Sequence, residues 1–148
     1  MVMYIRAFIY PAIIALACSS EANARACQTA DLAGVWYGTS SIVNSANSAM
    51  NYALNCRLDF KRRGRVTALA EGKCTAVSSN PAIDGMENDI ISSEAMFTPK
   101  SCELEIMLGS ARGGQSTIKG YLSLRSKEIF ATTKNTTGGV GVINFVKE

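Results

Sequence analysis

The stretch Leu32–Val43 reads LAGVWYGTSSIV and holds the only tryptophan of the chain, Trp36, placed between Gly34 and Gly38. It begins a run of segments in which apolar and polar residues alternate, and this run continues to the C-terminus. A period of two residues is typical of strands with one buried face. We therefore expect Leu32–Val43 to be the first strand of an all-β domain.

Seven further segments continue this pattern, separated by short turns and by two longer polar loops, Asn44–Asn51 and Ser78–Asn88. The expected strands are Ala53–Phe60, Arg65–Val77, Asp89–Phe97, Cys102–Leu108, Ser116–Leu124, Glu128–Lys134 and Val140–Val146. No segment has a helical period. A meander of eight strands can close on itself and remove its exposed edges. We predict an eight-stranded antiparallel up-and-down barrel, disulfide-bonded, with a two-layer sandwich as the alternative.

The residues expected to face the interior include both small and large side chains. Small residues at Ala68, Ala70 and Gly120 leave room, whereas larger side chains fill it: Leu54, Leu58, Phe60, Leu104, Ile106, Leu122 and Leu124. Eight strands enclose a space that side chains just fill or that holds one small ligand. The pattern leaves both interiors open.

The N-terminal residues have the features of a secretory signal. Met1–Arg6 is short and basic, Ala7–Cys18 is apolar but too short to span a bilayer, and Ala22–Ala24 ends in small residues. We predict a signal peptide over residues 1–24 and a single barrel domain over 25–148, exported to the periplasm or secreted. The alternative is a lipoprotein that keeps Cys18 as its first residue.

Cysteine usage fits an oxidised domain. Removal of residues 1–24 leaves Cys27, Cys56, Cys74 and Cys102, an even set that predicts two disulfides in one of three pairings. The second and third strands form a tight hairpin that brings Cys56 and Cys74 to facing strands, though not directly opposite. We therefore pair Cys56 with Cys74, which leaves Cys27 with Cys102. Without histidine or a C-x-x-C pair, we expect no metal site and no cofactor.

Composition argues against catalysis and nucleic-acid binding. The chain lacks histidine, the commonest general base, and has no nucleophile motif. A net charge of +3 is too weak to imply nucleic acid. One basic cluster, Lys61, Arg62, Arg63 and Arg65, occupies a predicted hairpin tip. It either discourages edge pairing or meets an anionic partner, such as a membrane surface or an acidic protein.

The sequence Gly34-Val-Trp36-Tyr37 at the start of the first strand resembles the signature of the calycin barrels, which include lipocalins and avidins. In that group the tryptophan plugs one end of the barrel and packs on an arginine from the last strand. Here the last strand carries Lys147 and no arginine. The resemblance implies a barrel that holds a small apolar ligand.

A second resemblance rests on Leu32–Trp36, on Cys56-Arg-Leu58 and on Cys74. It is to small bacterial inhibitors of metalloproteases, which are exported, disulfide-bonded barrels. Their N-terminal trunk enters the protease cleft, and Arg25–Asp31 would be the trunk here. Cys27 within this segment departs from the pattern.

We therefore expect a non-catalytic exported binding protein. The calycin-like interpretation places a small apolar ligand at a mouth covered by the two long loops, with Trp36, Tyr37 and Tyr52 near the barrel ends as candidate ligand-binding residues. The alternative is a solid barrel that inhibits a protease or docks onto an envelope or secreted protein. A purely structural envelope protein is the third possibility.

Overall fold

The computed structural model describes residues 26–125 and 127–148. The signal peptide predicted over residues 1–24, and Cys18 with it, lie outside these residues. These described residues form one short α-helix, one 3₁₀ turn and eight strands: α1 (Thr29–Leu32), β1 (Gly34–Asn44), η1 (Ser48–Met50), β2 (Tyr52–Arg62), β3 (Thr67–Val77), β4 (Glu87–Thr98), β5 (Glu103–Ser110), β6 (Gln115–Ser123), β7 (Glu128–Asn135) and β8 (Gly139–Lys147). No helix among the described residues is long and apolar enough to cross a membrane.

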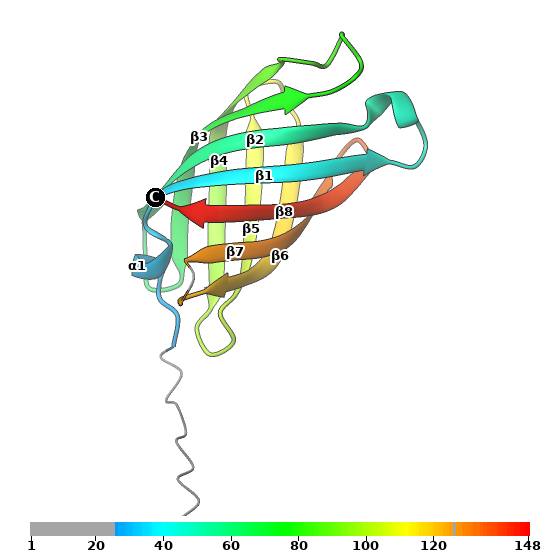
Figure 1. Cartoon of the computed structure of the whole chain (residues 1–148). Helices are drawn as coiled ribbons and strands as arrows, with labels where there is room; N and C mark the ends of the chain where they lie inside the picture. The colour runs from blue at the N-terminus through cyan, green and yellow to red at the C-terminus, as the bar shows by residue number, and fades with distance from the viewer. Residues whose placement is uncertain (1–25, 126) are drawn as a thin grey trace, which may run out of the picture.

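The strands form one closed antiparallel barrel in sequence order (Figure 1). Each strand pairs with the next, and β1 pairs with β8 from Trp36 opposite Lys147 to Asn44 opposite Gly139. This pairing leaves no open sheet edge. The predicted up-and-down barrel is confirmed, and the sandwich alternative is wrong.

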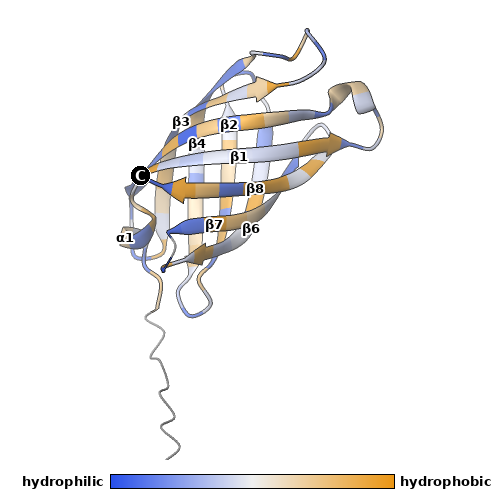
Figure 2. Cartoon of the chain, viewed as in Figure 1, coloured by the Kyte–Doolittle hydropathy of each residue, from blue (hydrophilic) through white to orange (hydrophobic). Residues whose placement is uncertain are grey.

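Figure 2 shows hydrophobic and hydrophilic stretches along the strands of the barrel wall, most clearly in β8. In β1 every second residue from Trp36 to Asn44 is buried, and the residues between them are exposed. Strands with this pattern bury one face inside the barrel and leave the other in solvent. The period of two therefore decides which side chains reach the interior.

The half of the interior next to α1 is packed solid. Its largest side chains are almost fully buried: Trp36, Leu58, Phe60, Ile106, Ile129 and Phe145. The ring of Phe145 lies against the backbone of Gly38, where an added Cβ would come within 2.3 Å of it. We call this the closed end of the barrel.

The small residues expected to leave room lie in this packed half. Ala68 and Ala70 pair with the last residues of β2 and are buried. A Cβ on Gly120 would lie 2.1 Å from the carbonyl oxygen of Phe130, so its backbone approaches β7 closely. The expectation that these residues open the interior is wrong, because neighbouring backbone and side chains take up the space.

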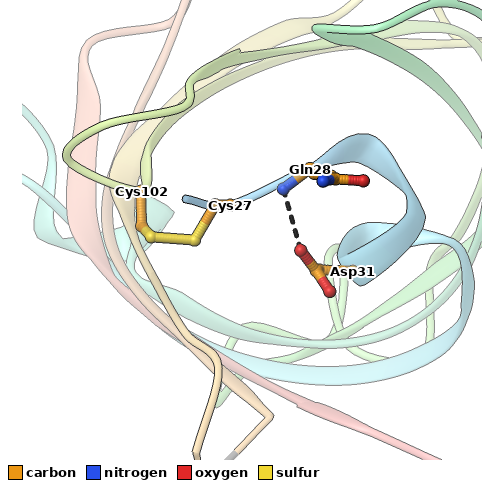
Figure 3. Close-up of a disulfide and its surroundings, with 4 residues drawn as sticks. All are labelled: Cys27, Gln28, Asp31 and Cys102. Atoms are coloured by element: carbon orange, nitrogen blue, oxygen red, sulfur yellow. Dashed lines mark hydrogen bonds between the residues drawn. A yellow bond between two sulfur atoms is a disulfide. The ribbon is translucent and has the colours of Figure 1, made fainter. Parts of the chain in front are cut away.

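The first strand begins two residues later than predicted, because Leu32 belongs to α1. Gln28 precedes this single turn, and its backbone N–H donates to the carboxylate of Asp31 at 2.8 Å (Figure 3). The carbonyl of Leu32 then accepts a hydrogen bond from Trp36 Nε1 at 2.6 Å. The turn therefore folds over the closed end and pairs the buried indole N–H.

Both predicted disulfides are present, Cys27–Cys102 and Cys56–Cys74. Figure 3 shows Cys27 joined to Cys102 at the closed end. Cys56 and Cys74 are directly opposite each other, with 4.0 Å between their Cα atoms. The expectation of an offset pair is wrong, because β2 continues to Arg62 and the chain turns at 63–66 rather than at 61–64. This turn pairs Arg62 with Ala68 and so places Cys56 opposite Cys74.

Candidate functional site

A cavity of about 320 Å³ occupies the other half of the barrel. Residues from all four connections at the end opposite α1 contribute to its lining, so the cavity opens at that end, which we call the mouth. The lining residues with apolar side chains are Ile42, Met50, Leu54, Ala76, Ile83, Met86, Ile90, Leu108, Ile118 and Ile143, together with Cys56 and Cys74.

The cavity exists because the inward positions near the mouth carry smaller side chains than those near the closed end. Ser40 in β1, Ala76 in β3 and Ser116 in β6 face the cavity. In the closed half, the inward positions carry the large aromatic side chains of Trp36, Phe60 and Phe145, which fill the barrel. Phe145 and the Cys56–Cys74 disulfide lie at the level where packed core gives way to open space.

The loops at the mouth are bonded to one another. Asn80 Nδ2 donates to the Ala49 carbonyl at 3.0 Å, and Ser78 Oγ donates to the Asn51 carbonyl at 2.9 Å. Asn44 Nδ2 donates to the Thr137 carbonyl at 3.1 Å, which joins the first loop to the β7–β8 turn. Cross-linking of this kind holds a site in shape before a ligand arrives, which lowers the entropy cost of binding.

Tyr52 lies across the mouth from β2 toward β7. Its hydroxyl oxygen accepts a hydrogen bond from Asn135 Nδ2 at 3.0 Å, although β2 and β7 are not neighbours in the barrel. The Oδ1 atom of Asn135 accepts from the backbone N–H groups of Thr137 and Gly139 and fixes the side chain. The Tyr52 side chain is therefore held in a fixed position at the opening of the cavity, where its ring forms part of the lining.

The cavity is close to neutral. Within the described residues, Arg112 in the β5–β6 turn is the only charged side chain that lines it. No group of three or more acidic or cysteine side chains in the described part of the chain could hold a metal ion. The site therefore suits an apolar body with a few polar atoms.

The structure separates the three aromatic residues proposed from the sequence. Tyr52 lines the cavity. Trp36 is fully buried at the closed end, where Lys147 Nζ lies 5.6 Å from the centre of its ring and donates to the Asp31 carbonyl at 2.9 Å. Tyr37 is 49% exposed on the outer wall, and its contact raises the pKa of Arg57. Only one of the three meets the cavity.

Most of the lining residues were not singled out from the sequence. For Ser40 a signal was present, because it shares the inward face of β1 with Trp36. Met50, Ile83 and Met86 lie in loops or at their ends, where the alternation of apolar and polar residues does not indicate which side chains face inward. Their position depends on how the loops fold over the mouth.

The predicted basic cluster lies at the closed end, away from the cavity. Lys61, Arg62, Arg63 and Arg65 are all exposed at the β2–β3 hairpin. Lys61 Nζ pairs with Glu71 across the hairpin at 2.5 Å, and this bond raises the pKa of Lys61. The cluster is thus partly neutralised, and contact with a membrane surface or an acidic protein stays a prediction.

The segment proposed as a protease-binding trunk is held against the barrel from Cys27 onward. Cys27 is disulfide-bonded and its backbone N–H donates to the Pro99 carbonyl at 3.0 Å. Thr29 is buried, and its Oγ1 donates to the Gly64 carbonyl at 2.7 Å. Protease inhibition stays a prediction, and it would require this segment to act from a fixed position.

A larger recess, of about 830 Å³, lies on the outer wall over β1 and β5–β8. Its walls are outward-facing side chains, among them Val43, Val142 and Lys134. It is an open groove lined mostly by exposed side chains. The interior cavity lies inside the closed barrel and has an apolar lining, so it is the better candidate site.

No family model and no curated protein matches the chain. The chain is similar to solved structures of designed proteins. The redesigned β-barrel mFAP1 bound to DFHBI is 12% identical, with a TM-score of 0.62 over 80% of this chain and 97% of that one. A de novo designed fluorescence-activating β-barrel is 11% identical, with a TM-score of 0.60 over 78% of this chain and 93% of that one. At these identities the likeness shows the fold alone.

Proposed function

We propose that this protein binds a small, mainly apolar molecule inside the barrel and does not act by catalysis. The observation that carries the proposal is the cavity of about 320 Å³ at the mouth, enclosed by apolar side chains and a bonded rim. Concave apolar sites of this size, with a few polar groups, are typical of ligand pockets. The similar designed barrel mFAP1 was solved with a small molecule, DFHBI, bound, which supports the same use of this architecture.

The test fills the cavity without disturbing the outer wall. Ala76 faces the cavity and is 3% exposed, whereas Val77 is 48% exposed on the other face of β3. We expect the purified protein to bind anilinonaphthalene sulfonate or DFHBI saturably, measured by fluorescence. Ala76→Phe should weaken that binding at least about tenfold, because the ring takes up the space of the ligand. Val77→Phe should leave it unchanged.

Circular dichroism and thermal melting of both variants check that the barrel stays folded. If neither dye binds saturably, or if folded Ala76→Phe binds as well as the parent protein, the interior is not the binding site and the proposal fails.

We further propose that the chain is exported, to the periplasm or to the medium. The two disulfides support an oxidising compartment, because such bonds are rare in reducing cytosol. Intact mass of protein recovered outside the cytoplasm tests this. We expect a chain that begins at Arg25 and gains the mass of four hydrogen atoms on reduction. A chain that still carries residues 1–24, or no mass gain, would contradict it.

A further inference from the structure

The turns at the closed end of the barrel carry basic residues and no acidic ones. They join β2 to β3, β4 to β5 and β6 to β7, and they are residues 63–66, 99–102 and 124–127 (Figure 1). The charged residues in these turns are all exposed, and they are Arg63, Arg65, Lys100, Arg125 and Lys127. The four turns at the mouth carry one acidic residue, Asp84, and one basic residue, Arg112. Charge is therefore distributed unevenly along the barrel axis.

Acidic residues near the closed end do not cancel this charge. They are Asp31 in α1, Glu103 and Glu128 at the starts of β5 and β7, and Glu148 after β8. Arg62 and Lys147, the last residues of β2 and β8, offset two of them. A positive excess remains, and it lies in the turns, which form the end of the barrel.

This end suits a broad, flat partner. Its interior is packed solid, and the three basic turns lie around it instead of along one groove. Among the exposed large apolar side chains of the described residues, Val66 is the only one in these turns, and none of the turn residues is aromatic. Cores of protein interfaces are rich in aromatic side chains and poor in lysine, so this surface does not resemble one. A bilayer with anionic headgroups presents a flat, negative plane that attracts several basic turns at once.

We propose that the closed end docks on a bilayer surface rich in anionic lipid headgroups, through the turns 63–66, 99–102 and 124–127. Because the mouth is at the opposite end, the cavity then opens away from the bilayer, toward the aqueous phase. No charged residue of these turns lines the cavity. Docking therefore holds or fails independently of the proposed ligand binding.

Cosedimentation with lipid vesicles tests the docking surface. We expect the protein to bind vesicles of equal parts phosphatidylglycerol and phosphatidylcholine at low salt, and not vesicles of phosphatidylcholine alone. Binding should fall at least about tenfold at about 1 M salt, where the screening length is about 3 Å. Lys100→Glu should weaken binding at least about fivefold, because one basic residue near an anionic surface contributes about that factor.

Lys134→Glu is the matched control, since it makes the same charge change at an exposed residue near the mouth end of β7. It should alter vesicle binding by less than about twofold. Arg63→Glu/Arg65→Glu should weaken binding more than Lys100→Glu does, because it reverses two charges. Circular dichroism and thermal melting check that each variant is folded.

Three results would each overturn the proposal: equal binding to both kinds of vesicle, binding that salt does not weaken, or equal losses in Lys100→Glu and Lys134→Glu. Absence of binding to the anionic vesicles would overturn it too, and binding of polyglutamate in that case would assign the closed end to an acidic protein. The dye-binding test of the cavity is unaffected by any of these results.

Discussion

Trp36 holds the closed end together at the level of a single residue. Its indole N–H donates to the Leu32 carbonyl at 2.6 Å, its ring meets Phe60 edge-on, and it is fully buried. Trp36→Phe removes the donor and leaves the Leu32 carbonyl buried without it. We expect the free energy of unfolding to fall by about 2–4 kcal/mol, from the lost hydrogen bond and lost volume. Urea unfolding followed by circular dichroism measures it.

The same variant separates the closed end from the mouth. Because Trp36 does not line the cavity, dye binding should stay within about twofold of that of the parent protein under conditions where both are folded. A large loss of binding by folded Trp36→Phe would contradict the division of the interior into two halves. For the same reason, tryptophan emission reports on the closed end and not on the cavity.

At the scale of elements, α1 and the residues before it are tied to the barrel by Cys27–Cys102. This disulfide closes a separation of 75 residues, against 18 for Cys56–Cys74. On the chain-entropy model the longer loop contributes about 4 kcal/mol and the shorter about 3 kcal/mol. We expect the double variant Cys27→Ser/Cys102→Ser to be the less stable of the two double variants. It should also show faster hydrogen exchange confined to α1 and its flanks.

The matched double variant Cys56→Ser/Cys74→Ser serves as the control. It should lose stability without the local increase in exchange at α1, because that disulfide joins neighbouring strands within the wall. Equal exchange at α1 in the two variants would show that packing of Leu32, and not the disulfide, holds this segment.

Strand alternation predicted the elements but not the cavity. The period of two indicated eight strands and their order, because each strand buries one face. The tight second hairpin then paired Cys56 with Cys74, and Cys27–Cys102 followed by elimination. It missed α1, since four residues are too few for a helical period to show. It also placed free space at Ala68, Ala70 and Gly120, none of which lines the cavity. The two alanines are buried, and at Gly120 the backbone of Phe130 and residue Ala131 of β7 come close. Cavity shape depends on such contacts across the barrel, which one strand's pattern does not encode.

At the scale of the whole molecule, the barrel depends on the joint between its first and last strands. β8 pairs with β1 along nearly its whole length, and the same joint forms one wall of the cavity through Ile42 and Ile143. The pairing of β1 with β8 therefore both stabilises the barrel and forms part of the cavity wall. Loss of this joint would expose the edges of β1 and β8, and open strand edges pair with other chains.

Gly141 allows that joint to form, and it provides the test. A Cβ at Gly141 would lie 1.9 Å from the backbone carbonyl oxygen of Ser41 in β1, a distance that only backbone movement can relieve. We expect Gly141→Ala to lower the free energy of unfolding by more than about 2 kcal/mol and to weaken dye binding. It should also produce dimers or larger species in size-exclusion chromatography, because the strained joint exposes two edges.

Gly114→Ala is the matched control for this substitution. Gly114 lies in the β5–β6 turn, where an added Cβ would approach only Ser110 Oγ, at 3.4 Å, and should be tolerated. If Gly141→Ala were as stable and monomeric as Gly114→Ala, the backbones of β1 and β8 could move apart enough to accept the added Cβ without losing their pairing. Cavity and closure would then be independent. If it aggregates and loses the dye together, the joint that completes the barrel is also the wall that shapes its site.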